Sequence, residues 1–220
     1  MLSAENLASI ESEGRRLIRF VEREPDRPVP QYPDWTLADL ASHTGSIHGR
    51  TTLIVTDLPT ERISAPTLPE GVDVVEWYVE TLEGMIAALR ASDPEAPCWA
   101  FGPKPCAGFW ESRMVIETGV HRWDAAQAFG EEDRLIDNVA RNGLDEFGDM
   151  WLPQLGEVAT LEITATDLGT SWVYGSRELA ATIEGTASDL YLRLVSRPSP
   201  VQLPSDWAAA VDGLAPPPKR

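Results

Sequence analysis

A carboxylate and an imidazole stand four residues apart in the stretch from residue 109 to residue 129. These are Glu117 and His121. On a helix this spacing puts both side chains on one face, with their Cβ atoms about 6 Å apart. A carboxylate and an imidazole placed in this way can bind one divalent cation. The chain has three histidines, so a second imidazole ligand must come from His43 or His48.

Both remaining histidines fall on one expected helix. This helix starts at Thr36 and Asp39, which have the spacing of a capping box, and ends near residue 58. His43 lies between apolar positions and is expected to point inward. His48 follows five residues later, rotated by about 140° around the helix axis. The two histidines are therefore not expected to face the same site directly.

Two imidazoles and one carboxylate form a recognised metal-binding set. Three protein ligands leave one position open in catalytic zinc sites, and the same set with two open positions suits iron and other six-coordinate ions. The spacing alone leaves a second interpretation open. Glu-x-x-x-His is common on solvent-facing helices, and Arg113 precedes Glu117 by one turn, which is suitable for an ordinary ion pair worth about 0.2–0.5 kcal/mol.

Helices of about twenty residues are expected to position these side chains. Apolar residues recur at helical spacing in four segments, which favours a four-helix bundle. The segments are residues 3–24, 36–58, 72–91 and 109–129. Residues 28–33 are too rich in proline for regular structure, and residues 94–106 are expected to form a long loop that is unusually aromatic.

The pattern changes after residue 134. A helix is expected at residues 137–150, strands at 159–166, 171–174 and 179–184, a helix at 186–195, and a short last helix capped by Ser205. The predicted fold is therefore α+β with two domains. Residues 1–134 form a four-helix bundle, residues 135–215 form a small α+β domain with a short antiparallel sheet, and residues 216–220 form a disordered tail.

Composition excludes several classes of function. The 18 basic and 35 acidic residues give a formal net charge of −17, which disfavours binding to nucleic acids and to anionic membranes. Two cysteines cannot build a disulfide framework, and Cys98 and Cys106 are expected to be free structural thiols, with a functional thiol as the alternative. No apolar run is long enough for a membrane span, and no secretory signal is visible, so a cytoplasmic protein is expected.

Two segments resemble the motifs of the mycothiol-dependent maleylpyruvate isomerase family. The first is Trp35-Thr36-x-x-Asp39-Leu40-x-x-His43. The second is Phe109-Trp110-x-x-Arg113-Met114-x-x-Glu117-x-x-x-His121-Arg122-Trp123-Asp124-Ala125. The C-terminal part, from residue 161 to residue 197, is also similar to the corresponding domain of that family.

The resemblance implies a DinB-like bundle that holds a divalent metal, typically zinc, followed by a sterol-carrier-like domain. The positions that match the family's metal ligands are His43, Glu117 and His121. Ni²⁺ or Fe²⁺ are alternatives to Zn²⁺, because the donor set accepts several ions. The family also implies mycothiol as cosubstrate and an arginine from the C-terminal domain, for which Arg197 is the best match.

The activity expected from this resemblance is that of a metal-dependent thiol enzyme. A thiolate would attack a small electrophile such as maleylpyruvate, and would then leave again in an isomerase or stay attached in a transferase. His48 and Asp124 are further candidates for catalysis, as a proton carrier and as a group that orients a ligand. The candidates for substrate binding are Trp99, Phe101, Trp110 and Arg113.

Two other functions remain open from the residues. One is a non-catalytic binder of a lipid or other small molecule, with a structural metal. The other is a metal-dependent enzyme that uses no thiol, such as a hydrolase. A site closed by four ligands would favour the binder, and an open site beside a pocket would favour an enzyme.

Overall fold

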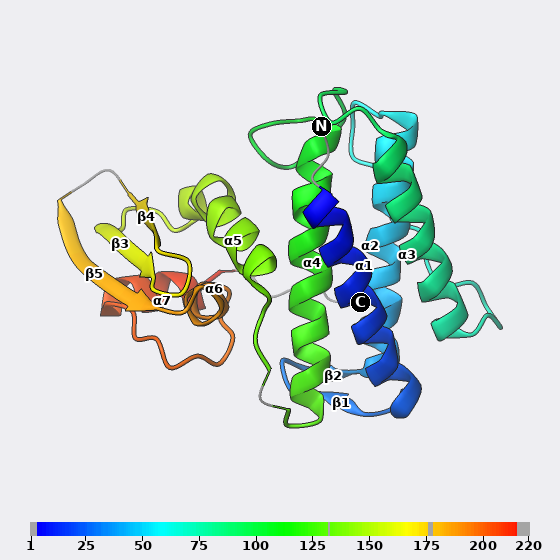
Figure 1. The fold of residues 1–220 in the computed structure, drawn as a ribbon, viewed down its shortest axis with the longest axis horizontal. Helices are drawn as coiled ribbons and strands as arrows, with labels where there is room; N and C mark the ends of the chain where they lie inside the picture. Colours follow the sequence, from blue (N-terminus) through cyan, green and yellow to red (C-terminus); the bar gives the residue numbers. More distant parts are fainter. Residues whose placement is uncertain (1–3, 132, 176–177, 215–220) are drawn as a thin grey trace. The chain divides into compact units, whose positions relative to one another are not determined.

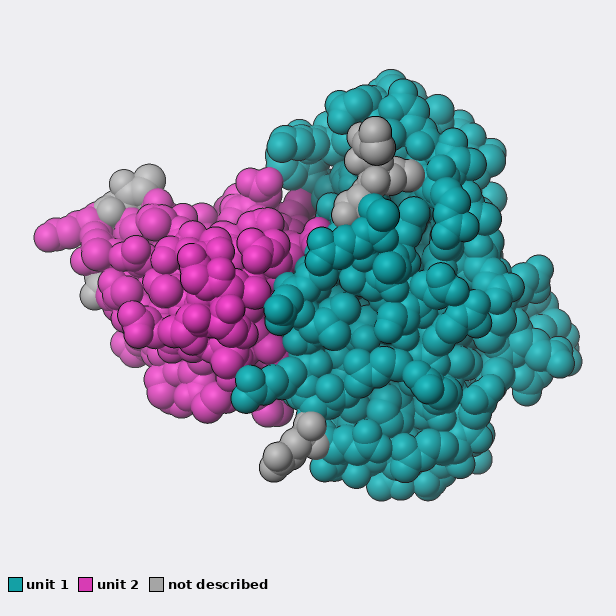
Figure 2. Space-filling view, viewed as in Figure 1, with its two compact units in different colours: residues 1–139 teal, residues 140–220 magenta. Residues whose placement is uncertain are grey.

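The structure is a computed structural model that describes residues 4–131, 133–175 and 178–214 (Figure 1). The chain divides into two compact units, Met1–Val139 and Ala140–Arg220 (Figure 2). The tail expected at residues 216–220 lies outside the described residues, and so does residue 3 at the start of the first expected helix.

Four long helices form the first unit. They are α1 (Ala4–Arg23), α2 (Leu37–Asp57), α3 (Val74–Ala91) and α4 (Ala107–Ala128). Their bounds lie within two residues of the expected ones. The capping box that begins α2 is confirmed, because the Thr36 hydroxyl accepts a hydrogen bond from the Asp39 backbone N–H and the Asp39 side chain accepts one from the Thr36 backbone N–H. Helix α1 packs against α3 and α4, and α2 packs against the same two helices.

Helix α4 is the most deeply buried element of this unit. Every residue from 114 to 126 is buried. A helix that is buried on all sides is normally apolar, but this one carries several polar or charged side chains. They are Glu117, Thr118, His121, Arg122 and Asp124. Burial of such groups costs free energy unless they are paired. The partners of these side chains therefore indicate which of them belong to a functional site.

The proline-rich segment before α2 is a small β-ribbon. Strands β1 (Pro28–Val29) and β2 (Tyr32–Thr36) pair in antiparallel fashion. The expectation of irregular structure there was wrong. Proline is tolerated at the edges of sheets, and a two-stranded ribbon consists only of edges.

A three-stranded sheet is the centre of the second unit. It contains β3 (Thr160–Ala165), β4 (Thr170–Tyr174) and β5 (Leu179–Gly185) in the order β4-β3-β5. The strands β3 and β4 pair in antiparallel fashion, but β5 runs parallel to β3. The sheet is therefore mixed, and the expectation of a sheet that is antiparallel throughout was wrong. Alternation of apolar and polar residues identifies a strand, but it reveals neither the neighbouring strand nor the relative direction of the two.

Helices flank this sheet in the sequence. Helix α5 (Asp137–Glu146) spans the division between the units and continues as a π-helical turn, η1 (Phe147–Trp151), and a 3₁₀ turn, η2 (Leu152–Gln154). Helices α6 (Ala187–Leu194) and α7 (Ser205–Asp212) follow the sheet. Ser205 is the first residue of α7 and Pro204 occupies the cap position, so the expected Ser205 cap was wrong. No helix in the described part of the chain has the length and hydropathy needed to span a bilayer.

Candidate metal centre

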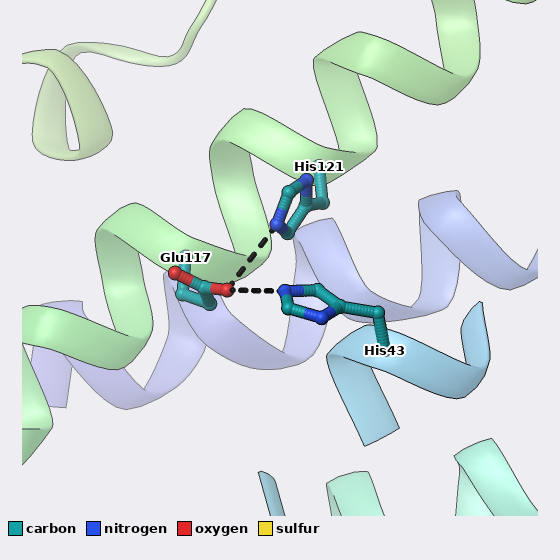
Figure 3. A group of neighbouring side chains, drawn as sticks. All are labelled: His43, Glu117 and His121. Atoms are coloured by element: carbon teal, nitrogen blue, oxygen red, sulfur yellow. Dashed lines mark hydrogen bonds and ion pairs between the residues drawn. The ribbon is translucent and has the colours of Figure 1, made fainter. Parts of the chain in front are cut away.

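Three side chains from two helices converge at one point of the first unit. His43 comes from α2, and Glu117 and His121 come from consecutive turns of α4 (Figure 3). Each offers one ligand atom, and these atoms lie within 4.8 Å of one another. Oε1 of Glu117 is 3.4 Å from Nε2 of His43 and 3.2 Å from Nε2 of His121. The structure thus brings together the three residues that the motifs single out.

A buried carboxylate fixes the orientation of the His121 ring. Nδ1 of His121 lies 3.1 Å from Oδ2 of Asp124, and the Asp124 side chain is fully buried. A carboxylate hydrogen-bonded to one nitrogen of a histidine fixes the tautomer and leaves the other nitrogen as a donor of electrons. Nε2 of His121 is therefore the nitrogen presented to Glu117.

The charges in this group are balanced by their neighbours. Burial would raise the pKa of Glu117, but the Arg113 guanidinium and hydrogen bonds from His121 and His43 hold it well below its usual value. Burial would lower the pKa of His121, but hydrogen bonds to Asp124 and Glu117 raise it to about 9. Glu117 is thus an ionised carboxylate, with its second oxygen bound by Arg113.

Two aromatic rings from strand β2 cover the imidazoles. The Trp35 ring lies 5.0 Å from the ring of His43, and the Tyr32 ring lies 5.9 Å from that of His121, measured between centroids. Both aromatic side chains are buried. Neither was predicted to belong to the site, because Tyr32 lies in the segment that was expected to be irregular and Trp35 lies just outside the expected helix.

The structure places His48 against another partner. Its Nε2 lies 3.0 Å from the hydroxyl of Thr118, and its ring lies 5.4 Å from that of Tyr78. Burial lowers the pKa of His48 to about 3, so the imidazole is neutral. His48 therefore contacts Thr118 of α4, the residue after Glu117. It is not one of the three residues whose ligand atoms converge.

The aromatic loop between α3 and α4 folds onto the start of α4. Trp99, Phe101 and Trp110 lie with ring centroids 5.5–6.2 Å apart. The Trp110 indole donates a hydrogen bond to the carbonyl of Trp99 at 2.8 Å, and Phe101 remains 44% exposed. Cys98, within this loop, and Cys106, at its end, are free thiols.

Arg50 lies near the start of α4, and the sequence did not identify it as a candidate site residue. Its guanidinium carbon lies 5.9 Å from the Trp110 ring centroid. Arg50 follows His43 by seven residues, which on a helix is the same face two turns away. That spacing was the signal that could have identified it.

Arg197 belongs to the second unit. It follows α6, where its backbone N–H donates to the carbonyl of Leu192 and its side chain donates to the carbonyl of Val195. Both contacts close the end of α6. Arg197 is therefore a partly buried arginine at a helix terminus.

The donor set of the first unit fits a divalent cation. Two imidazole nitrogens and one carboxylate oxygen face one another, and these are the donors that zinc, nickel and iron accept. The hydrogen bond from His121 to Asp124 supplies the outer support that such ligands usually have. The arrangement offers three protein ligands, which suits a site with a position left for a further molecule.

Comparisons with solved structures show that the fold is shared with known proteins. Two crystal structures share the fold, that of the mycothiol-dependent maleylpyruvate isomerase and that of a histidine-to-alanine mutant of it. Each has a TM-score of 0.66 and 14% sequence identity, over 91% of this chain and 94% of its own. A comparison with curated protein sequences finds no match.

A family model matches a longer part of the sequence than either motif. The model is described as the mycothiol maleylpyruvate isomerase N-terminal domain, and it matches residues 7–126. This range is more than half of the chain, and it contains His43, Glu117 and His121. By this match the chain belongs to the family of the mycothiol maleylpyruvate isomerase N-terminal domain.

Proposed function

We propose that this chain is a divalent-metal-dependent thiol enzyme. It uses mycothiol as cosubstrate, either as an S-transferase or as an isomerase, and acts on a small electrophile such as maleylpyruvate. Family membership supports the thiol and the class of reaction. The observation that carries the proposal is the convergence of His43, Glu117 and His121, whose ligand atoms lie within 4.8 Å of one another inside the matched domain.

The three converging residues would hold the metal. When bound, a divalent cation supplies a Lewis acid that lowers the pKa of a coordinated thiol. The remaining work falls to the chain's own groups. Asp124 keeps the His121 ring oriented with Nε2 toward the site. Arg113 keeps Glu117 ionised through its charge.

Aromatic side chains would bind the electrophile. In this proposal Trp99 and Phe101 supply apolar contact surface, and Arg113 attracts the negative charge of a substrate. Trp110, which is fully buried, supports the two rings from behind. His48 supports α4 through Thr118 and stays neutral, so its role is positioning. Arg197 enters the proposal through the family resemblance, as the arginine expected from the C-terminal domain.

Metal analysis tests the first part of this proposal. Protein purified without chelators should contain about one divalent ion per chain, as expected for one three-ligand site, and the His121→Ala variant should contain none. The surface variant Glu11→Gln, which removes one exposed carboxylate, serves as control. Equal metal content in all three proteins, or none in any, contradicts the proposal.

Turnover assays test the second part. The metal-loaded protein should conjugate mycothiol to an electrophile, or isomerise maleylpyruvate only when mycothiol is present, and His121→Ala should do neither. Arg197→Gln should lower turnover without a change in metal content. Hydrolysis without thiol would instead favour a thiol-independent enzyme, and stoichiometric metal without turnover would favour a binder.

A further inference from the structure

Arg50 lies at the far end of the helix pair that holds the metal ligands. Helices α2 and α4 run past each other in opposite directions in this region, because His43 faces Glu117 while Arg50 faces Trp110. Arg50 follows His43 by seven residues on α2, and Trp110 precedes Glu117 by seven residues on α4. Seven residues correspond to about 10 Å along a helix axis. Arg50 and Trp110 therefore form a second layer, two helical turns from the metal ligands.

The charge of Arg50 has no anionic partner within the described residues. No ion pair or hydrogen bond of its side chain is found there, and its Nε is buried without an acceptor. Its guanidinium lies over the ring of Trp110, at a distance where a guanidinium is attracted to an aromatic ring. A partly buried guanidinium thus keeps its hydrogen-bond donors available.

Burial and neighbouring positive charges disfavour the charged form of Arg50. Burial lowers the pKa of Arg50, and the positive charge of Arg62 lowers it further, while the attraction by Glu117 opposes this shift and Arg113 adds a smaller lowering. The carboxylate of Glu117 is already engaged by Arg113 and by both imidazoles. Two further arginines thus act on the charge of Arg50, in a chain whose formal net charge is −17.

Structural arginines of this protein have a different environment. Arg122 is fully buried on α4, and its guanidinium binds Glu13, Asp133 and the carbonyl of Arg134. That pattern satisfies a buried cation from all sides. Arg50 has none of these partners, so the stability of the fold does not explain its charge.

We propose that Arg50 binds the carboxylate of a small, planar, unsaturated acid. The planar fork of a guanidinium fits a carboxylate with two parallel hydrogen bonds. The positive charge of Arg62 also acts at this position, and the fully buried ring of Trp110 packs against the Arg50 guanidinium from one side. This inference rests on the proposed function for the identity of the substrate class, and it assigns the acid-binding residue of that site.

Binding of benzoate, compared with that of its neutral counterpart benzamide, tests this assignment. Calorimetric titrations would use the full chain both as purified and after removal of metal by a chelator, so that direct binding of benzoate to a metal is recognised. In both forms we expect benzoate to bind and benzamide to bind more weakly. Arg50→Gln should weaken benzoate binding by about tenfold to a hundredfold, the range for hydrogen bonds to a charged group, and Arg50→Lys should have a smaller effect.

Arg15→Gln is the matched control for the change in net charge. Arg15 is an exposed arginine of α1 that pairs with Glu11 and Glu83, and its loss should leave benzoate binding unchanged. The metal content and the melting temperature of Arg50→Gln should be close to those of the wild type, because the replaced charge has no anionic partner within hydrogen-bond distance among the described residues. Sodium chloride at the concentration of benzoate should not displace it.

Three results would overturn the assignment. They are unchanged benzoate binding by Arg50→Gln, equal binding of benzamide and benzoate, and displacement of benzoate by an equal concentration of chloride. The titrations measure binding and not turnover. A protein that binds benzoate through Arg50 but shows no thiol-dependent reaction would refute the proposed function alone, and a protein active with mycothiol whose Arg50→Gln variant binds benzoate normally would refute this inference alone.

Discussion

The carboxylate of Asp124 accepts a hydrogen bond from Nδ1 of His121 across one turn of α4, at 3.1 Å. Asp124 is fully buried, and His121 is 6% exposed. Because this bond occupies Nδ1, the ring turns Nε2 toward Glu117 and His43. The orientation of one candidate metal ligand therefore depends on a residue that would not itself touch the metal.

The variant Asp124→Asn should weaken metal binding while the fold is retained. Asparagine has the same size but lacks the negative charge that holds the His121 ring and increases its basicity. Loss of such an outer partner costs about tenfold to a hundredfold in metal affinity. Competition between the protein and a chromogenic chelator for zinc measures this change.

The control for this variant is Glu11→Gln, which removes a carboxylate from the exposed side of α1. It should bind zinc as the wild type does. Circular dichroism should show the same helix content for all three proteins. If Asp124→Asn binds zinc as tightly as the wild type does, Asp124 does not position His121.

His48 should make the first unit less stable in acid. Its pKa in the folded protein is lowered to about 3 by burial, whereas in the unfolded chain it is about 6.5. Below pH 6.5 the unfolded chain therefore binds a proton that the folded protein refuses. The contribution of His48 is fully present above pH 6.5 and is lost as the pH falls toward 3, by up to about 1.4 kcal/mol per pH unit.

Urea unfolding at several values between pH 7 and pH 4 measures this effect. The variant His48→Gln keeps a hydrogen-bonding partner for Thr118 but does not titrate. The difference in unfolding free energy between wild type and variant should shrink as the pH falls. Parallel curves for the two proteins over this range would show that His48 is not buried as a neutral ring.

The features that could be predicted from the sequence are those set by residues close together in the chain. The capping box at Thr36 and Asp39 depends on residues three apart, and it is present in the structure as expected. The pairing of Glu117 with His121 also depends on helical spacing alone. The convergence of His43 on that pair, in contrast, depends on how α2 packs against α4. The sequence identified it through a motif and not through geometry.

Features that depend on distant partners were missed. The ribbon formed by β1 and β2 consists of strands of two and five residues, too short to give a periodic pattern. The direction of β5 depends on its pairing with β3. Arg50 carried a signal in its spacing from His43, but its significance comes from the absence of an anionic partner in the described structure, which the sequence does not reveal.

Loss of Arg122 should strongly destabilise the first unit. Its guanidinium joins Glu13 of α1 to Asp133, and both Arg122 and Glu13 are almost completely buried. The variant Arg122→Met leaves the buried carboxylate of Glu13 with Arg16 as its remaining cationic partner among the described residues, and the loss of one partner of a buried ion pair costs about 3–5 kcal/mol. Urea unfolding followed by far-ultraviolet circular dichroism measures the change.

An exposed ion pair on the same helix as Glu13 provides the comparison. Arg15 and Glu11 are both about half exposed, and pairs of this kind contribute about 0–1 kcal/mol. Arg15→Gln should therefore unfold almost as the wild type does. If Arg122→Met loses less than about 1 kcal/mol, the buried network does not stabilise the first unit.

Two helical glycines should respond in opposite ways to a single added methyl group. A Cβ at Gly119 of α4 would lie 2.5 Å from a methyl carbon of Val139, whereas a Cβ at Gly84 of α3 would meet no atom within 4 Å. Gly119→Ala forces packed side chains apart beside the candidate metal ligands, which costs about 1–3 kcal/mol. Gly84→Ala only restricts the unfolded chain and should stabilise the protein by about 0.4–1 kcal/mol. Melting temperatures should therefore fall for Gly119→Ala and rise for Gly84→Ala, and a shift of the same sign in both variants would contradict the close packing of α4 against Val139.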